Sequence, residues 1–570
     1  MSNEILIRID ENEYTVPAYT SVESVFVKAG MLEQGYSERP INYLDNPIIG
    51  AFVNGQLCPI SSHIQMSCEV KPIRAFDSFG RRIYRHSICF LLCYATKLVF
   101  PKRHLVIGHA LGDGFYFSFD DAYKTTEAQI KTLAQKMHQL VDANLPIKNR
   151  SLSNQEAIKY FREEGYDATA LLLETQNNPL VDVYVISNNI SKKQQNYCNI
   201  AYEPIAPNTS VLSVWELTKY GKSGMLLRYP VANNVTSVVE ARDNSAMYKV
   251  YMENKKWGKY LGIRCVGELN KCGLENKLAQ YVRLSETLQR RKISEIADRI
   301  VEGKKKAVFV AGPSSSGKTT FAKRICEQLR LLDHEPIRIS LDDYYKKRCE
   351  APLDIDGKPD LEALEALNIA LFDQNMKDLF LGKEVDLPKF SFPRQETYYE
   401  NKPIKLTEKT IFVIEGLHGL NPQITSKIEA KYAFKIYISA LTQLNMDDCN
   451  RVSTTDDRIL RRVLRDYRTR NASAEDTLLM WPSVARGERI HIFPNQNNAD
   501  VMFNSALDYE IGVLSPYVQP LLKEVSPSSG EAYTQARRLL SFLENVYPIP
   551  SHLVPSDSLL REFIGDSDYE

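Results

Sequence analysis

The residues best suited to chemistry form one glycine-rich segment, Gly312-Pro-Ser-Ser-Ser-Gly-Lys-Thr-Thr320. The pattern GxxxxGK followed by Ser or Thr surrounds phosphate oxygens with backbone N–H groups, while the lysine supplies positive charge and the next hydroxyl can ligate Mg²⁺. An apolar run over 306–311 precedes the segment and a helical pattern follows it to Leu332, which is the strand–loop–helix context that the pattern requires. We therefore predict an ATP-phosphate site rather than a flexible Gly/Ser linker. Its predicted residues are Gly312, Pro313, Ser314, Ser315, Ser316, Gly317, Lys318, Thr319 and Thr320.

Two carboxylates end the next two apolar runs. The run 336–340 leads into Asp342 and Asp343, and the run 410–414 ends at Glu415. Ligands of open parallel sheets bind beyond the C-terminal ends of the strands, so we expect Asp342 beside the glycine-rich loop as the base for an acceptor hydroxyl. The predicted Mg²⁺ ligands are Thr319, Asp342 and Glu415. The alternatives are a solvated turn at 342–343 and an exposed strand end at Glu415.

Six arginines crowd one predicted helix and its end: Arg458, Arg461, Arg462, Arg465, Arg468 and Arg470. Spacings of three and four residues bring several of them to one face, and arginine suits bidentate phosphate binding. Such a helix can close over ATP as a lid and screen the charge of the transition state, and we assign Arg468 and Arg470 to ATP. The alternative is a solvated face paired with Asp456, Asp457 and Asp466.

An α/β fold of the P-loop NTPase type would position these residues. Strands and helices alternate from Lys305 onward, and this alternation predicts a parallel sheet flanked by helices. The front of the chain predicts a small α+β module, with strands over 3–8 and 13–17, a helix after Ser21 and a hairpin over 49–59. Helical patterns follow at 82–99, 126–144 and 153–164, a strand-like run at 106–119 and a strand-rich region to about Tyr229. A mixed connecting stretch covers 230–275, and a charged helix covers 274–303.

The composition of the 570 residues is that of a globular protein with several domains. Lys plus Arg equals Asp plus Glu at 71 each, which gives no general attraction to nucleic acid or membranes. No signal peptide is recognised at the N-terminus, and the most apolar stretch, 88–100, is too short to span a bilayer. The ten cysteines are scattered, so we expect reduced thiols and a cytoplasmic protein.

The motifs of the C-terminal half, in their order, resemble the phosphoribulokinase/uridine kinase family, and uridine/cytidine kinases most closely. The resemblance rests on the glycine-rich loop, 340–345 (Ser-Leu-Asp-Asp-Tyr-Tyr), 413–416 (Val-Ile-Glu-Gly) and 461–466 (Arg-Arg-Val-Leu-Arg-Asp). It implies ATP and Mg²⁺ as cofactors, with Asp342, Lys318 and Arg465 catalytic. It also implies a nucleoside site made of Tyr345, Asp360, Phe390 and Arg462.

The match departs from uridine kinases at two places. A histidine that reads the pyrimidine follows the aromatic residue in that family, whereas 391–395 (Ser-Phe-Pro-Arg-Gln) contains none. A later lid arginine of the family falls near Ala472. These departures leave the kinase class in place and bear on the specificity for pyrimidines.

The front half resembles two modules of threonyl-tRNA synthetases. Residues 1–72 look like a β-grasp TGS module, with 49–55 as the most telling segment, and 81–119 resembles the editing domain. That domain uses an HxxxH pair and a CxxxH pair, of which only His86 remains here; Phe90, Ala201 and Ile205 occupy the other positions. We expect a module that has lost hydrolysis and binds a ligand, docks on the kinase or mediates oligomerisation.

The two resemblances together describe an architecture seen in bacterial TGS-containing nucleoside kinases. Residues 555–565 of this chain also resemble the C-terminal tail of those proteins. The expected domains are a TGS-like module over 1–72, an editing-like domain over 73–230, a connecting region with a helix over 231–303, a kinase domain over 304–525 and a tail over 526–570. The expected reaction moves the γ-phosphate of ATP to the 5′-hydroxyl of uridine or cytidine. The alternatives are an RNA-associated nucleotide sensor and a P-loop kinase for another small acceptor. We expect a nucleoside partner, no membrane and no nucleic acid, and leave a homo-oligomer open.

Overall fold

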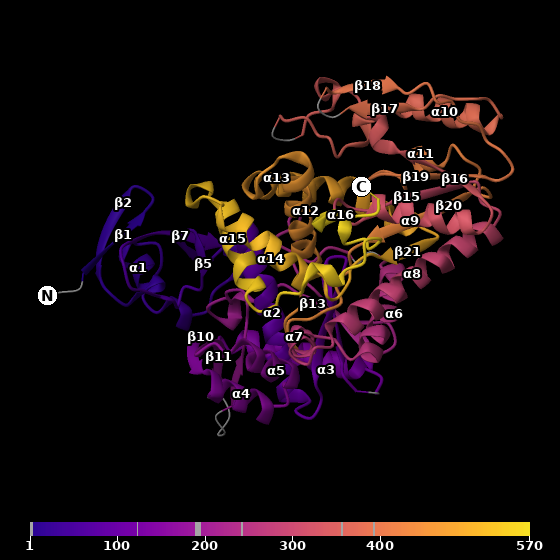
Figure 1. Ribbon diagram of the computed structural model, residues 1–570. Helices are drawn as coiled ribbons and strands as arrows, with labels where there is room; N and C mark the ends of the chain where they lie inside the picture. Colours follow the sequence, from indigo (N-terminus) through magenta and orange to yellow (C-terminus); the bar gives the residue numbers. More distant parts are fainter. Residues whose placement is uncertain are drawn as a thin grey trace.

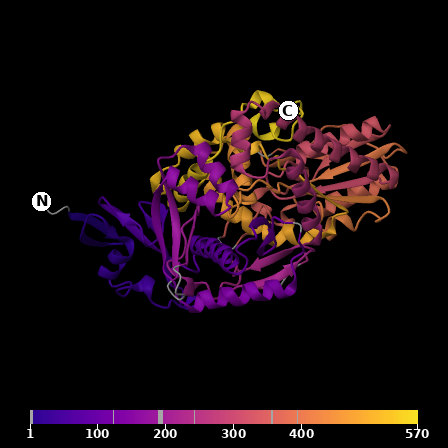
Figure 2. The same ribbon diagram turned by 90° about the horizontal axis from the view of Figure 1, so that it is seen from below.

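The structure is a computed structural model that describes residues 4–121, 123–188, 195–240, 243–354, 357–391 and 394–569. The molecule is elongated, with the N-terminal strands at one end and a large parallel sheet of the C-terminal half at the other (Figure 1). Figure 2 shows the same arrangement from below, with the middle of the chain between the two ends. None of the described helices is long and apolar enough to cross a membrane. All ten cysteines are free thiols.

The N-terminal module is a five-stranded sheet of order β2-β1-β7-β4-β5 with one helix packed on it. The predicted hairpin and helix are confirmed, and Ser21 caps the helix by accepting from the N–H of Ser24. Asn3, the first residue of the strand expected over 3–8, lies outside the described residues. The elements are β1 (Glu4–Ile9), β2 (Asn12–Pro17), β3 (Thr20–Ser21), α1 (Val22–Lys28), β4 (Ile48–Val53), β5 (Gln56–Cys58), β6 (His63–Ile64) and β7 (Cys68–Arg74).

The second region packs the long helix α2 against two antiparallel sheets, of order β13-β14-β9-β8 and β10-β11-β12. Most of α2 is buried, because its apolar residues occupy more than one face. The helices predicted near 82–99, 126–144 and 153–164 are confirmed. The elements are α2 (Ser78–Val99), β8 (Leu105–Leu111), β9 (Gly114–Phe119), α3 (Glu127–Asp142), β10 (Ile147–Ser153), α4 (Asn154–Glu163), α5 (Asp167–Gln176), β11 (Leu180–Asn188), β12 (Gln195–Asn199), β13 (Glu216–Tyr220) and β14 (Gly224–Arg228).

The region expected to be strand-rich holds β11, β12, β13 and β14, and the structure adds helices that the sequence pattern did not delimit. One of them is α5, whose central Ala170–Leu173 is a continuous apolar run without clear amphipathic periodicity. The connecting stretch 230–275 contains two helices, α6 (Ser245–Leu261) and α7 (Val266–Leu274), and α7 packs against α5. The predicted charged helix is α8 (Leu278–Glu302), which packs against α9 (Lys318–Leu331).

The C-terminal half is built on a five-stranded parallel sheet of order β16-β19-β15-β20-β21. Its central strand is buried on both faces: Val308 and Val310 face the core under α8 and α9, while Phe309 faces the opposite core. The predicted parallel sheet flanked by helices is confirmed. The elements are β15 (Ala307–Ala311), α9 (Lys318–Leu331), β16 (Glu335–Ser340), α10 (Ile369–Phe380), β17 (Pro388–Ser391), β18 (Glu396–Tyr399), β19 (Thr410–Glu415), α11 (Pro422–Thr425), β20 (Ala433–Ser439), α12 (Thr454–Arg470), α13 (Ala474–Gly487) and β21 (Val501–Asn504).

The last segment of the chain returns to the rest of the molecule. Helix α15 (Glu531–Leu543) packs on α14 (Glu510–Lys523) and reaches the N-terminal module, where the Thr534 hydroxyl donates to the Gly55 carbonyl at 2.7 Å. The short helix α16 (Arg561–Ile564) lies against α12, so the C-terminus sits near the centre of the molecule (Figure 1). The segment expected as a tail is therefore packed against two distant parts of the chain.

Candidate active site

The glycine-rich loop joins β15 to α9 in the way that its pattern predicts. A Cβ atom on Gly312 would lie 2.1 Å from the Ile438 carbonyl oxygen, so the neighbouring strand β20 requires glycine there. Ser315 and Gly317 have positive φ angles of 58° and 79°, which turn the loop around its own N–H groups. Helix α9 begins at Lys318, and its N-terminus adds a positive dipole end to the loop. This geometry is that of a phosphate cradle.

Two loop side chains face the carboxylates predicted from the sequence. The Lys318 ammonium donates to the Pro313 carbonyl at 3.0 Å; burial lowers its pKa, and the charges of Glu415 and Asp342 oppose that shift. The Thr319 hydroxyl donates to a Glu415 carboxylate oxygen at 3.5 Å. The strand order explains the contact between Thr319 and Glu415, because β19 lies directly beside β15 and ends at Glu415.

Asp342 follows β16, one strand further from the loop, yet its carboxylate belongs to the same group of charges. Burial raises the pKa of Asp342, and the charges of Lys318 and Arg470 oppose the rise. Burial, followed by the charge of Asp342, raises the pKa of Glu415 to about 7. The buried carboxylate of Glu415, the half-buried carboxylate of Asp342 and the Thr319 hydroxyl form a set of oxygen donors that suits Mg²⁺, whose charge would relieve the repulsion between the carboxylates. The residues present therefore fit the metal expected from the sequence.

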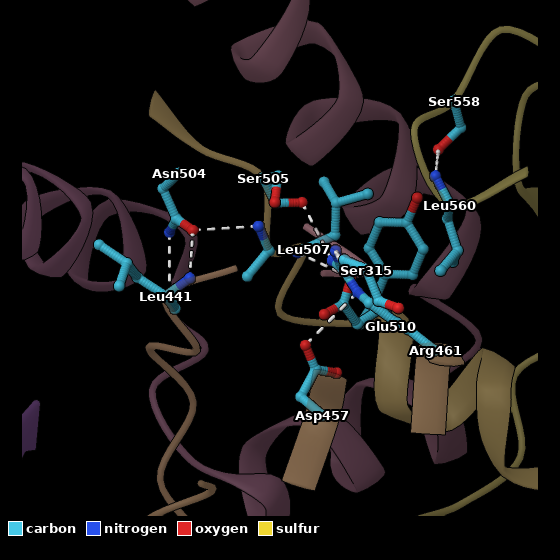
Figure 3. A network of polar contacts seen from close by, with 12 residues as sticks. Ser315, Leu441, Asp457, Arg461, Asn504, Ser505, Leu507, Glu510, Ser558 and Leu560 are labelled. Atoms are coloured by element: carbon cyan, nitrogen blue, oxygen red, sulfur yellow. Dashed lines mark hydrogen bonds and ion pairs between the residues drawn. The ribbon is translucent and has the colours of Figure 1, made fainter. Parts of the chain in front are cut away.

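Helix α12 packs against the loop, and three of its arginines are buried, so the alternative of a solvated face does not hold for Arg458, Arg461 and Arg462. The Arg458 Nε donates to the Ser314 carbonyl at 3.0 Å, and an Arg461 Nη donates to the Ser315 carbonyl at 3.4 Å. Arg461 is 1% exposed and pairs with Asp457 and Glu510 (Figure 3). Spacing alone cannot distinguish a buried arginine row from a solvated one, because the difference lies in what packs against it.

A second group of arginines gathers on Asp466. Its carboxylate accepts from Arg462 at 3.1 Å and from Arg465 at 2.8 Å and 3.0 Å, and lies 3.5 Å from Arg470. Arg462 also donates to the Ser314 hydroxyl at 2.8 Å, which ties this group to the phosphate loop. Asp466 thus positions three guanidinium groups near the carboxylates of Asp342 and Glu415.

Arg468 lies elsewhere. Its guanidinium donates to the Phe563 carbonyl of α16 at 3.1 Å, and therefore faces the C-terminal segment. The assignment of Arg468 to ATP stays a prediction.

Three of the residues assigned to the nucleoside lie together on the far side of Asp342. The Tyr345 hydroxyl donates to the Leu361 carbonyl at 3.0 Å, next to Asp360, and the rings of Tyr345 and Phe390 have centroids 6.2 Å apart. The Asp360 carboxylate accepts from the Glu362 N–H at 3.0 Å. Phe392 and Pro393, near the expected place of the missing histidine, lie outside the described residues.

Sequence reasoning missed several residues of the site. Glu488 accepts from the Ser314 N–H at 2.9 Å and pairs with Arg458. Burial and the charge of Glu488 raise the pKa of Glu362 to about 7. His418 is 2% exposed, and burial lowers its pKa to about 4. Only His418, three residues after Glu415, stands at a position that strand-end reasoning could have found.

Residues 307–511 match the model of the Phosphoribulokinase / Uridine kinase family. This kinase domain covers the phosphate loop, both carboxylates and the arginine helix. A further 171 residues are similar to threonine–tRNA ligases of Francisella tularensis: 30% identical in subsp. novicida (strain U112) and 29% in subsp. holarctica (strain LVS), over 30% of this chain. The match spans 26% of each relative, about a quarter of its length. The chain thus joins a kinase-family domain to a segment similar to these ligases.

Two solved structures resemble the chain weakly. A possible uridine kinase from Bacillus stearothermophilus has 14% identity and a TM-score of 0.25, over 37% of this chain and all of the other. D-glycerate 3-kinase from Cryptococcus neoformans has 12% identity and a TM-score of 0.22, over 44% of this chain and 87% of the other. These values carry no argument about the acceptor of the kinase domain.

The four positions compared with the editing motif do converge in the front half. His86, Phe90, Ala201 and Ile205 line one cavity of about 20 Å³. The ring of Phe90 contacts that of Tyr197, with centroids 5.0 Å apart, and burial lowers the pKa of His86 to about 3. A cavity of this size holds about one water molecule.

Proposed function

We propose that this protein is an ATP-dependent nucleoside kinase that phosphorylates the 5′-hydroxyl of uridine or cytidine. The convergence of Lys318, Thr319 and Glu415 with Asp342 carries the proposal. A domain that only senses nucleotide has no use for a carboxylate such as Asp342 beside its phosphate loop, whereas phosphoryl transfer needs one to receive the proton of the acceptor.

The residues divide the work as follows. The loop N–H groups and Lys318 hold the phosphates of ATP, and the 5′-oxygen of the nucleoside bonds to the γ-phosphorus as its bond to the β–γ bridging oxygen breaks. The hydroxyl proton passes to Asp342, and ADP leaves. Arg462, Arg465 and Arg470 screen charge on the transferring group. Bound at Thr319, Glu415 and Asp342, Mg²⁺ would neutralise the β- and γ-phosphates.

The acceptor side supports a planar, polar substrate. Tyr345 and Phe390 offer aromatic surface to a base, and Asp360 offers a carboxylate to ribose hydroxyls. Glu362, whose pKa is raised to about 7, can donate as well as accept a hydrogen bond near neutral pH. These features support a nucleoside but do not select the base.

A labelled-phosphate screen tests this function. The full chain is incubated with [γ-³²P]ATP, Mg²⁺ and one acceptor at a time: uridine, cytidine, adenosine, guanosine, ribulose 5-phosphate, pantothenate or unacylated tRNA. We expect label in UMP and CMP, with Asp342→Asn as the inactive control. Transfer to another small acceptor with both pyrimidines inert would leave a kinase of different specificity. ATP consumption that depends on tRNA alone would favour the RNA-associated alternative.

A further inference from the structure

A second cavity, of about 410 Å³, lies between the front half and the kinase domain. Its walls come from α2, β9, the P-loop residue Pro313, β20 and the start of α12. None of Lys318, Asp342, Asp360 or Phe390 lines it, so it adjoins the candidate active site at Pro313 without containing the catalytic or acceptor residues. Its volume is within the range of small-molecule sites.

The cavity is rich in arginine. Its lining includes Arg82, Arg85, Arg451, Arg458, Arg489 and Arg538. Arg82 and Arg538 share Glu203 and Asp456, and Arg458 pairs with Glu488. Within the part of the chain that the structure describes, no ion pair joins Arg85, Arg451 or Arg489 to a carboxylate, although Asp113 and Asp243 also line the cavity.

Two of these guanidiniums are poorly compensated. The Arg85 Nε and an Arg451 Nη are buried without a hydrogen-bond partner. Both guanidiniums contact the Phe115 ring, 5.5 Å and 5.4 Å from its centroid. Burial lowers the pKa of Arg451 to about 10, and the charge of Arg85 contributes to the shift. Buried like charges with unused donors are costly unless an anion binds between them.

We propose that this cavity binds a small organic phosphate, with the phosphate group between Arg85 and Arg451. Guanidinium pairs suit a phosphate because each offers two parallel N–H donors to its oxygens. The organic part lies against aromatic side chains of the lining, among them Phe115, Tyr229 and Phe493. A free nucleotide has this combination of a phosphate and a flat ring.

The ligand would lie one contact away from the phosphate loop. Arg458 lines the cavity and donates to the Ser314 carbonyl, and Pro313 is part of both the cavity wall and the loop. The site is therefore placed to influence nucleotide binding in the kinase domain, whichever acceptor that domain uses.

Binding to the full chain tests the proposal. The Lys318→Ala/Asp360→Ala background weakens both the ATP site and the nucleoside site of the proposed active site, and neither residue lines this cavity. Binding of UMP, of inorganic phosphate and of unacylated tRNA is measured by calorimetry. We expect UMP to bind with one site, and phosphate to bind more weakly and to compete. Adding Arg85→Gln or Arg451→Gln lowers the affinity for UMP by roughly tenfold to a hundredfold, because each removes charged hydrogen bonds.

Matched variants keep the test decisive. Arg283→Gln, at an exposed position on α8, is expected to change nothing. Arg451→Lys keeps the charge but loses the paired donors, and gives an intermediate affinity if the Gln variants do not fold. Equal UMP binding in the folded Arg85 and Arg451 variants, or no binding of UMP or phosphate at millimolar concentration, overturns the proposal. Binding of tRNA that needs Arg451 while UMP is inert also overturns it and makes the cavity an RNA contact.

Discussion

The carboxylate of Glu562 accepts hydrogen bonds from both the backbone N–H and the hydroxyl of Thr320, at 3.2 Å and 2.7 Å. Thr320 is in the first turn of α9, where backbone N–H groups lack partners within the helix and serve phosphate in P-loop sites. Glu562 also lies close enough to act on the charges of Lys318 and Glu415. A residue of the C-terminal segment thus occupies part of the phosphate cradle.

This contact predicts that Glu562→Gln binds ATP more tightly. The amide keeps a hydrogen-bond acceptor near Thr320 but removes a negative charge from the helix N-terminus, so we expect the Kd for ATP to fall roughly twofold to fivefold. The Kd is measured by equilibrium dialysis without acceptor, with Glu544→Gln on the exposed end of α15 as control. Weaker binding in Glu562→Gln would show instead that the carboxylate holds the loop in shape.

The base is tested by Asp342→Asn. The variant should still bind ATP, but kcat should fall by about 10²- to 10⁴-fold, because an amide cannot take the proton of the acceptor. Lys318→Ala should weaken both ATP binding and turnover. Single-turnover assays with a radiolabelled nucleoside separate the two effects. Turnover by Asp342→Asn close to that of the wild type would remove Asp342 from the role of base.

The raised carboxyl pKa values predict a pH dependence. Glu415 keeps its proton up to about pH 7, so its ionised form, which can ligate a metal, predominates only above that pH. We expect kcat/KM for ATP to fall about tenfold per pH unit below about pH 7. The profile is measured from pH 5.5 to 8.5, and Glu415→Gln should lose this inflection along with most of its activity. A wild-type profile that stays flat to pH 5.5 contradicts the assignment.

The front half should not hydrolyse mischarged tRNA. Of the four positions that resemble the editing motif, only His86 can transfer a proton, and the cavity of about 20 Å³ that the four positions share leaves no room for a substrate. His86 also borders the cavity of about 410 Å³, but Phe90, Ala201 and Ile205 do not line it. The substrate is a threonine tRNA that has been mischarged with serine. We expect the full chain to deacylate it no faster than the uncatalysed reaction. Hydrolysis above that rate which disappears in His86→Ala would show that the cavity opens.

Arg461, the most deeply buried arginine of α12, should be essential to the stability of the kinase domain. Arg461→Ala leaves Asp457 and Glu510 as unpaired buried carboxylates, so we expect a loss of about 3–5 kcal/mol in the free energy of unfolding of the kinase domain. The loss is followed by chemical denaturation monitored through domain fluorescence, with Arg283→Ala as the exposed control. A change within 1 kcal/mol of the control would show that the network in Figure 3 relaxes without Arg461.

The sequence by itself determined the local elements of the kinase domain. The apolar run before Gly312, the loop pattern and the following helix each depend on neighbouring residues, so periodicity and backbone chemistry suffice to predict them. The positions of Asp342 and Glu415 followed from a general property of parallel sheets. The continuous apolar run in α5 shows where this reasoning ends, because burial on several sides removes the periodicity.

The tertiary structure alone decided which distant side chains meet. Glu488 and Glu562 reach the phosphate loop from 174 and 242 residues away, and neither belongs to a recognisable motif. The arginines of α12 have the same spacing whether solvated or buried, and only the packing of α14, α16 and the loop around them makes them internal. Strand order, helix docking and the cavity between the two halves depend on contacts across the whole chain, which local sequence patterns do not encode.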